Sequence, residues 1–163
     1  MRRCTFAILT LLFCTTRLRA EDPPKTEVFG GFSILSVDGV QAFGWQAAAQ
    51  GNLHKNIGIV ADISGHYKFH TSAYEFLFGP RFSLRGNRKT LFAHALFGSA
   101  RSEAFRDSVS SFAMGIGGGL DIRMSDRMAV RIFQLDWLPN RFEGDWQKLN
   151  GRIGFGVVWK SGS

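Results

Sequence analysis

The sequence predicts an all-β protein built as an eight-stranded antiparallel up-and-down barrel. Apolar and polar residues alternate with a period of two in one segment after another, and short groups of turn residues separate these segments. Glycine is abundant, at 19 of 163 residues, whereas proline numbers only 4. An excess of glycine that is not accompanied by an excess of proline indicates ordered strands and not a flexible linker. The composition, 45% hydrophobic and 20% charged, excludes a disordered or collagen-like chain.

The first segment, residues 1–20, is predicted to be a secretory signal peptide. Two arginines precede an apolar core from Thr5 to Cys14, and the segment ends at Ala20. A core of about ten residues is too short to cross a bilayer as a helix. Both cysteines of the chain lie here, so the exported chain is expected to have no disulfide and no thiolate metal site. A short N-terminal periplasmic segment, 21–26, is expected to follow.

The overall positive charge comes mostly from this signal. The chain has 20 basic and 13 acidic residues, a net charge of +7. Four of the arginines lie in residues 1–20, which leaves 16 basic residues against 13 acidic ones. No basic stripe or RNA-binding motif remains, so a nucleic-acid partner is not expected.

The first four predicted strands cover residues 27–35, 43–53, 57–68 and 74–85. The first strand, like the fifth at 90–100, is less regular than the others, but polar turns bound both. In the second, third and fourth, one parity carries isoleucine, phenylalanine, tyrosine or tryptophan. The opposite parity carries mainly glycine, alanine, glutamine and charged residues, so each strand has one apolar face.

The last four predicted strands cover residues 90–100, 112–124, 128–138 and 152–159. The alternation is clearest in residues 112–124, where phenylalanine, methionine, isoleucine and leucine alternate with alanine, glycine and charges. The barrel domain is therefore predicted to span residues 27–159, with a C-terminal tail at 160–163.

The strand at 128–138 breaks the alternation, because Arg131 falls on one parity and Gln134 and Asp136 on the other. A β-bulge near Ile132 and Phe133 would return all three polar side chains to one face, at the cost of one unpaired residue. A charge at a membrane interface is the alternative explanation.

The predicted connections alternate in length. Short turns lie at 54–56, 86–89 and 125–127, and longer polar stretches are expected as loops at 36–42, 70–73, 101–111 and 140–148. Tight turns on one rim and longer loops on the other are typical of bacterial outer-membrane barrels. Both termini then fall on the tight-turn, periplasmic rim.

The same parity also fits a secreted soluble barrel that binds a ligand in an apolar interior. The residues of the polar face favour the membrane alternative, because glycine and alanine with a few charges of both signs suit a crowded lumen better than a solvated surface. Aromatic residues near the strand ends suit interfacial girdles. These are Phe43, Trp45, Tyr67, Tyr74 and Trp137 at the loop rim and Trp159 at the other.

Residues 27–159 resemble the small OmpA-type and OmpX-type outer-membrane β-barrels. The most specific part is Gly117-Gly118-Gly119-Leu120-Asp121-Ile122-Arg123, followed by Ser125-Asp126-Arg127 and residues 129–137. The last strand also resembles the insertion signal of this class, although Lys160-Ser161-Gly162-Ser163 follow Trp159, where the family usually ends. The resemblance implies a monomer in the outer membrane of a Gram-negative bacterium, in contact with membrane lipids and lipopolysaccharide and inserted by the barrel-assembly machinery.

Charged side chains on the inward parity are candidates for a polar network that plugs the lumen, since buried charges need opposite partners. An eight-stranded barrel encloses side chains and not an open channel. A narrow conducting pore is the alternative. The candidate lumen residues are Asp62, His66, Lys68, Glu75, Arg81, Arg85, Asp121, Arg123 and Arg152.

Catalysis and metal binding are not expected, and no cofactor is predicted. His70 and Ser72 form a His-x-Ser pair that suits a lipid A-modifying enzyme, but no orienting carboxylate is identifiable. The four histidines have no metal-ligand spacing on one element.

The expected function is structural, or an interaction at the cell surface. Aromatic and basic residues of the longer loops are candidates for binding a partner, or else pack on the barrel mouth. These loop residues are Phe105, Arg106, Phe142 and Trp146.

Overall fold

The structure is a computed structural model that describes residues 23–37, 39–68, 71–104, 107–142, 145–147 and 150–162. No helix in these residues is long and apolar enough to cross a membrane. The predicted signal peptide lies outside the described residues. Eight strands form the wall: β1 (Thr26–Val37), β2 (Val40–Asn52), β3 (Ile57–Lys68), β4 (Thr71–Arg85), β5 (Lys89–Ala104), β6 (Asp107–Arg123), β7 (Met128–Trp137) and β10 (Gly151–Ser161).

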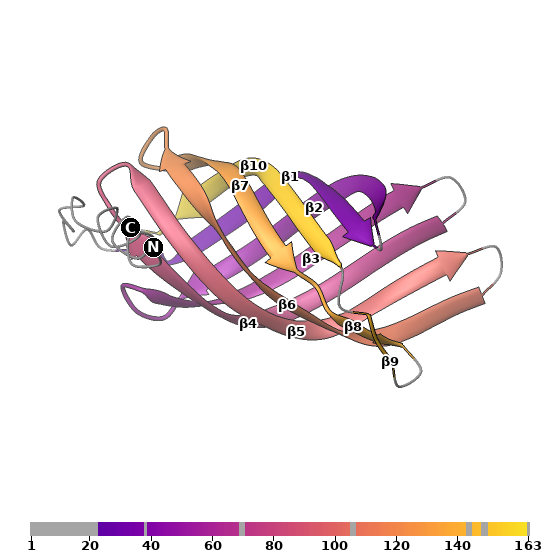
Figure 1. Cartoon of the computed structure of the whole chain (residues 1–163). Coiled ribbons are helices and arrows are strands. Elements are labelled where there is room, and N and C mark those ends of the chain that lie inside the picture. Colours follow the sequence, from indigo (N-terminus) through magenta and orange to yellow (C-terminus); the bar gives the residue numbers. More distant parts are fainter. Residues whose placement is uncertain are drawn as a thin grey trace, which may run out of the picture.

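The eight strands close into a barrel. Each strand from β1 to β6 pairs antiparallel with the next one, β7 pairs with β10, and β10 pairs with β1 (Figure 1). The predicted fold, an eight-stranded antiparallel up-and-down barrel, is therefore confirmed. Closure leaves no free edge along the wall, which satisfies the backbone hydrogen bonds of every strand there.

The two ends of the barrel differ. Both ends of the described chain, near Pro23 and Gly162, lie at the same end, here called the N/C rim (Figure 1). Three tight connections, residues 53–56, 86–88 and 124–127, also lie there because they join consecutive antiparallel strands. The opposite end is called the far rim.

The prediction of long loops at the far rim is mostly wrong. Only two residues separate β1 from β2, β3 from β4, and β5 from β6, at positions 38–39, 69–70 and 105–106. The polar stretches 70–73 and 101–111 instead continue the strands, so that Thr71 pairs with Ala104 and Glu103 pairs with Ser108. Polar residues mark where a strand leaves an apolar environment, and the backbone ladder can continue beyond that point.

The predicted loop at 140–148 contains a small hairpin. Its strands are β8 (Asn140–Phe142) and β9 (Asp145–Gln147). β8 pairs with β6 through Arg141 and Phe112, and β9 pairs with β8. The hairpin therefore extends the sheet beyond the end of β7, which is the shortest strand of the wall (Figure 1).

The β-bulge predicted in β7 is present. Leu120 pairs with Phe133 and the next residue, Asp121, pairs with Arg131, so Ile132 is left without a partner on β6. Ile132 and Phe133 both point outward, whereas Arg131 and Gln134 are buried. The extra residue thus keeps the polar side chains of β7 on the inner face.

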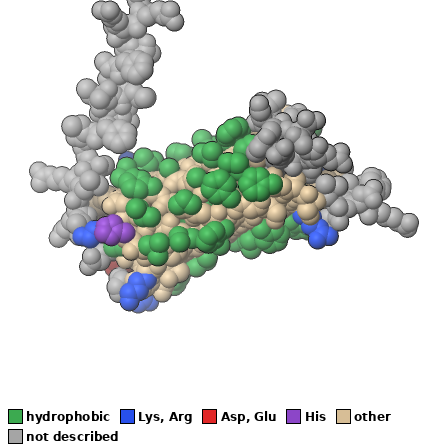
Figure 2. Space-filling view, turned by 90° about the horizontal axis from the view of Figure 1, so that it is seen from below, with side chains coloured by type: hydrophobic (Ala, Val, Ile, Leu, Met, Phe, Trp, Pro, Cys, Tyr) green, Lys and Arg blue, Asp and Glu red, His purple; other side chains and the backbone are tan. Residues whose placement is uncertain are grey.

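The outer face of the barrel is apolar and the inner face is polar. Large hydrophobic side chains are exposed along the wall, for example Phe32 at 68% and Phe78 at 59%, whereas Arg131 and Arg152 are at most 2% exposed. Hydrophobic side chains cover the flank in Figure 2, with Lys, Arg and His side chains near its ends. The alternative of a soluble barrel with an apolar interior is therefore wrong, because the two faces have the opposite arrangement.

The last residues complete the closure at the N/C rim. Lys160 and Ser161 belong to β10 and pair with Glu27 and Thr26. The backbone N–H of Lys25 also donates a hydrogen bond to the carbonyl of Gly162 at 2.7 Å. The residues after Trp159 are thus part of the barrel wall up to Ser161.

The contact between β1 and β10 requires glycine on the inner face. Gly31 and Gly156 pair with each other. A Cβ atom on Gly31 would overlap the carbonyl oxygen of Phe155, whereas a Cβ on the neighbouring Gly30 would meet no atom within 4 Å. Gly31 therefore allows close approach of the two strands that close the barrel.

Candidate functional site

The candidate site is the polar interior of the barrel, because the inward parity brings charged residues from many strands together. The strands hold these side chains away from solvent, and an eight-stranded barrel is narrow enough for them to meet across it. The buried charged and amide side chains are Glu27, Gln46, Gln50, Asp62, Glu75, Arg81, Asp121, Arg131, Gln134, Asp136, Asn150, Arg152 and Lys160.

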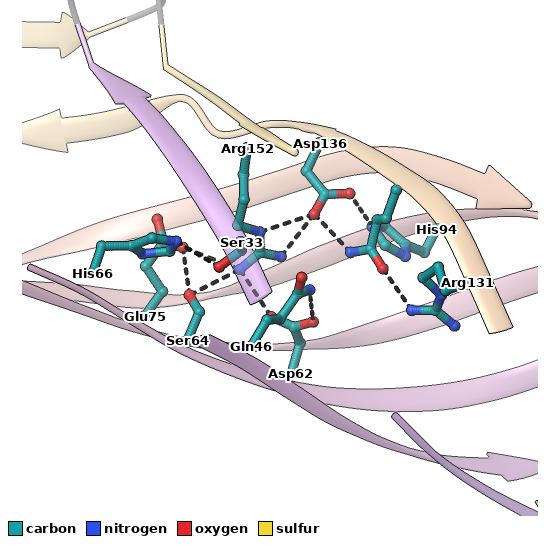
Figure 3. A network of polar contacts seen from close by, with 11 residues as sticks. Ser33, Gln46, Asp62, Ser64, His66, Glu75, His94, Arg131, Asp136 and Arg152 are labelled. Carbon is teal, nitrogen blue, oxygen red and sulfur yellow. Dashed lines mark hydrogen bonds and ion pairs between the residues drawn. The ribbon is translucent and has the colours of Figure 1, made fainter. Parts of the chain in front are cut away.

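Arg152 on β10 is the centre of the first group, here called the Arg152 cluster. Its guanidinium contacts three carboxylates, with nitrogen–oxygen distances of 3.0 Å to Asp62, 3.2 Å to Glu75 and 2.7 Å to Asp136 (Figure 3). The acids come from β3, β4 and β7. In the ring of eight strands β4 lies opposite β10, so the pair of Arg152 and Glu75 crosses the full width of the lumen.

Neutral donors complete the hydrogen bonding of these carboxylates. The Gln46 amide donates to Asp62 at 2.6 Å, and the Ser64 hydroxyl donates to Glu75 at 2.9 Å. Asp136 accepts from Gln134 at 2.7 Å and contacts His94 Nε2 at 2.9 Å (Figure 3). One guanidinium therefore shares three acids with amide, hydroxyl and imidazole groups, as a buried charge requires.

Asp121 on β6 is the centre of the second group, the Asp121 cluster. Arg131 binds it in a bidentate manner, with 2.8 Å from Nε and 3.1 Å from Nη2, and Arg81 approaches to 3.3 Å. Both guanidinium groups also contact the ring of Phe92, with the Cζ atoms of Arg81 and Arg131 at 3.6 and 4.4 Å from its centroid. Cation–π contact thus helps two arginines to share one carboxylate.

Glu27 forms a third ion pair at the N/C rim. Arg85 Nη2 lies 2.7 Å from Glu27 Oε1, and the Asn52 side chain bridges the two residues. Lys160 is buried close by. Among the described residues, the buried or ion-paired side chains of the interior include five acids and five bases, so their formal charges cancel. These are Glu27, Asp62, Glu75, Asp121 and Asp136 with Arg81, Arg85, Arg131, Arg152 and Lys160.

Buried apolar side chains fill the lumen beside these ion pairs. They include Leu77 on β4, Leu96 on β5, Ala113 on β6 and Leu138 after β7. A Cβ added to Gly115 would approach Leu77 and Leu138 within 3.3 Å, so little space is left between them. The polar groups and this apolar cluster together occupy the interior.

The lumen residues named from the sequence divide into two sets. Asp62, His66, Glu75, Arg81, Asp121 and Arg152 are buried in the interior. Lys68, Arg85 and Arg123 are only partly buried at the two ends of the barrel, with Arg85 still paired to Glu27.

Other members of the network are not among the lumen residues predicted from the sequence. The predicted bulge indicates that Arg131, Gln134 and Asp136 share one face, but it does not identify their partners. Glu27, Gln46 and His94 are further members. Gln46 and His94 lie on the inward parity of β2 and β5, so the alternation of these strands was the available signal.

Half of the six candidate loop and enzyme residues lie outside the described part of the chain. Phe105, Arg106 and His70 lie outside it, and Ser72 is partly buried on β4. The backbones of Phe142 and Trp146 belong to β8 and β9. Their proposed binding roles stay predictions.

The described histidines have separate surroundings. His66 Nε2 lies 2.8 Å from the Ser33 hydroxyl, His94 contacts Asp136, and His54 is exposed in a turn. The Ser33 and His66 pair has the spacing of a nucleophile and its base, but His66 Nδ1 has no partner within the described residues and both side chains are buried. In the described residues, no group of three or more His, Cys, Asp or Glu side chains is placed to hold a metal ion.

The sequence matches no protein-family model and no curated protein. Solved structures are similar, however. Neisserial surface protein A superposes with a TM-score of 0.62 at 10% identity, covering 83% of this chain and 95% of that one. The N-terminal β-barrel domain of Pseudomonas aeruginosa OprF gives 0.60 at 12% identity, covering 83% and 97%.

The attachment invasion locus protein Ail of Yersinia pestis is also similar, with a TM-score of 0.54 at 14% identity, covering 84% of this chain and 98% of that one. These proteins are small eight-stranded barrels of the outer membrane. At such low identity the likeness concerns the fold, and this chain has the fold of the small transmembrane barrels.

Proposed function

We propose that this chain is an integral outer-membrane protein of a Gram-negative bacterium with a plugged lumen, and that its role is structural or is exercised at the cell surface, without catalysis. The observation that carries the proposal is the inverted polarity of the barrel. Exposed phenylalanine, isoleucine and tryptophan cover the outer wall, while ion-paired charges fill the interior. Such a wall is stable only where hydrocarbon replaces water around it.

The ion pairs support a plug over a pore. The contact of Arg152 with Glu75 joins opposite walls, and the contact of Arg85 with Glu27 joins β4 to β1, three strands away. A water path would have to separate these pairs, which is costly because each separation leaves an uncompensated charge in a narrow lumen. Leu77 and Leu96 narrow the remaining space further.

A surface role is supported by the similarity to barrels whose names refer to the cell surface or to attachment. In this chain the far rim is the end that would face outward if both termini are periplasmic. The residues proposed to contact a partner there are Phe105, Arg106, Phe142 and Trp146.

Two measurements test the proposal. In a cell fraction enriched in outer membrane, the protein should migrate differently on SDS–PAGE with and without boiling, because the closed barrel resists the detergent until heated. In planar lipid bilayers the folded protein should give no discrete conductance steps. Recovery in the soluble periplasmic fraction without a gel shift would contradict the membrane assignment, and regular conductance steps would contradict the plug.

A further inference from the structure

The three tight turns at the N/C rim each carry basic residues that the ion-pair networks do not use. Lys55 lies in the first turn, Arg88 and Lys89 lie at the second, and Arg127 lies in the third. All four side chains are exposed. Within the described residues, none of them takes part in an ion pair, in contrast to the arginines of the lumen. These four residues are called the basic arc below.

The basic arc has little acidic compensation. Asp126, next to Arg127, is the one exposed acid among the described residues of these three turns. Glu27, the nearest rim acid on β1, is buried and paired with Arg85. The four bases and one acid give a local net charge of +3, and these side chains are exposed at the rim.

Hydrogen bonds between the turns hold the arc in one arrangement. Arg85 Nη1 donates to the Lys55 carbonyl at 2.6 Å, which joins the first turn to the second. The N–H of Arg123 donates to the Arg88 carbonyl at 2.8 Å, which joins the second turn to the third. The N–H of Lys160 donates to the Arg127 carbonyl at 2.8 Å, so the arc continues to β10.

Apolar side chains beside the arc indicate its depth relative to the bilayer. Leu53 and Met124 are each 70% exposed and lie within three residues of Lys55 and Arg127. Trp159, on the last strand, is exposed as well. Long basic side chains and tryptophan take up positions at the headgroup level, with the apolar residues directed toward the hydrocarbon.

A hollow at this rim offers a place for one headgroup. Its lining includes Arg127, Trp159, Lys160 and Ser161, with the Asp126 carboxylate also present. A guanidinium beside an indole and a hydroxyl matches a phosphate that is attached to an apolar chain.

From these observations we propose that the basic arc binds the headgroups of anionic phospholipids in the leaflet beside the N/C rim, and so surrounds this end of the barrel with anionic lipid. The inference rests on the transmembrane location proposed above. Each Lys or Arg near an anionic surface contributes attraction that decays within a Debye length, about 8 Å at physiological ionic strength. Four such residues on one rigid rim favour phosphatidylglycerol over zwitterionic phosphatidylcholine.

Electron paramagnetic resonance with spin-labelled lipids tests this directly. The full chain is refolded in phosphatidylcholine bilayers that contain a small amount of labelled phosphatidylglycerol or of labelled phosphatidylcholine. The fraction of each label that the protein immobilises is then measured. At low salt the labelled phosphatidylglycerol should be enriched at the protein by at least about twofold. The enrichment should fall toward one at about 1 M NaCl, where the Debye length is near 3 Å.

Two variants separate the arc from a general effect of charge. The variant K55Q/R88Q/K89Q/R127Q should show equal immobilisation of both labels. The far-rim variant K68Q/R101Q should keep the enrichment of the wild type. If the fourfold variant fails to show the gel shift of a closed barrel, the charge-conserving variant K55R/K89R provides the comparison, and it should retain the enrichment.

The outcomes distinguish this inference from the proposed function. Immobilisation of neither label would mean that the protein does not contact lipid, which would overturn the membrane assignment. Equal immobilisation of both labels by the wild type, or enrichment that survives in the fourfold variant, would overturn the lipid preference alone. Loss of the enrichment with inorganic phosphate, but not with NaCl at equal ionic strength, would overturn it in favour of a site for free phosphate.

Discussion

Replacing Arg152 with methionine tests whether the Arg152 cluster stabilises the barrel. The change keeps an unbranched side chain of similar length but removes the cation from three buried acids, Asp62, Glu75 and Asp136. Each acid keeps a neutral donor, but the change removes both the cation and the hydrogen bonds that Arg152 donates to Asp136, Glu75 and Ser64. Removing one partner of a buried ion pair costs about 3–5 kcal/mol, and we expect a loss of this size in the free energy of unfolding.

The assay is urea unfolding of the protein in lipid vesicles, followed by tryptophan fluorescence and by the gel shift on SDS–PAGE. The double variant R152M/E75Q should recover at least about 1 kcal/mol of the loss, because it removes one of the uncompensated charges. The rim variant H54M, at an exposed turn residue outside the basic arc, is the control and should change stability by less than about 0.5 kcal/mol. If R152M unfolds at the same urea concentration as the wild type, or E75Q gives no recovery, charge compensation in the Arg152 cluster does not stabilise the barrel.

Three further changes test the two faces of the wall. Phe155→Arg, on the outer face of β10, should cost about 2–4 kcal/mol in the same unfolding assay, and a loss below about 0.5 kcal/mol would contradict the lipid-facing assignment. Gly31→Ala should cost about 1–3 kcal/mol because its methyl group would overlap the Phe155 carbonyl. Gly30→Ala is the control and should be nearly neutral. Equal effects of the two substitutions on the free energy of unfolding would contradict the close packing of β1 on β10. Deleting Ile132 should leave a barrel that still shows the gel shift, because it removes only the bulge, whereas deleting Leu135 should abolish the shift by turning the following acid toward lipid.

The sequence was sufficient to predict the fold because the side-chain period of a strand is two and the barrel has one apolar face. The same rule located the bulge, since no regular strand places Arg131 and Gln134 on one side. The connections at the far rim were not predictable in this way. Polar residues at 101–111 suit both a loop and a hairpin outside the membrane, and only backbone pairing distinguishes them.

The candidate site was predictable in its location but not in its contacts. Parity placed Arg152, Asp62 and Glu75 inside, but it carries no information about which of them meet across the lumen. That depends on the stagger of the strands, which brings Arg152 level with Asp136 in the neighbouring strand and with Glu75 on the opposite wall. Glu27 and His94 are not predicted as lumen residues because the apolar and polar residues of the first and fifth strands alternate less regularly.

The position of Arg152 on the last strand has a consequence for the order of assembly. Its partners Asp62 and Glu75 precede it by 90 and 77 residues, so neither contact can form before β10 is in place. Before β10 joins the sheet, the carboxylates of Asp62 and Glu75 lack the Arg152 guanidinium that compensates their charge. Contacts between residues so distant in sequence are expected to form slowly. Neutralisation of the Arg152 cluster and closure of the wall are thus one event, and a chain that stops short of β10 would be left with unpaired acids from this cluster on an open sheet.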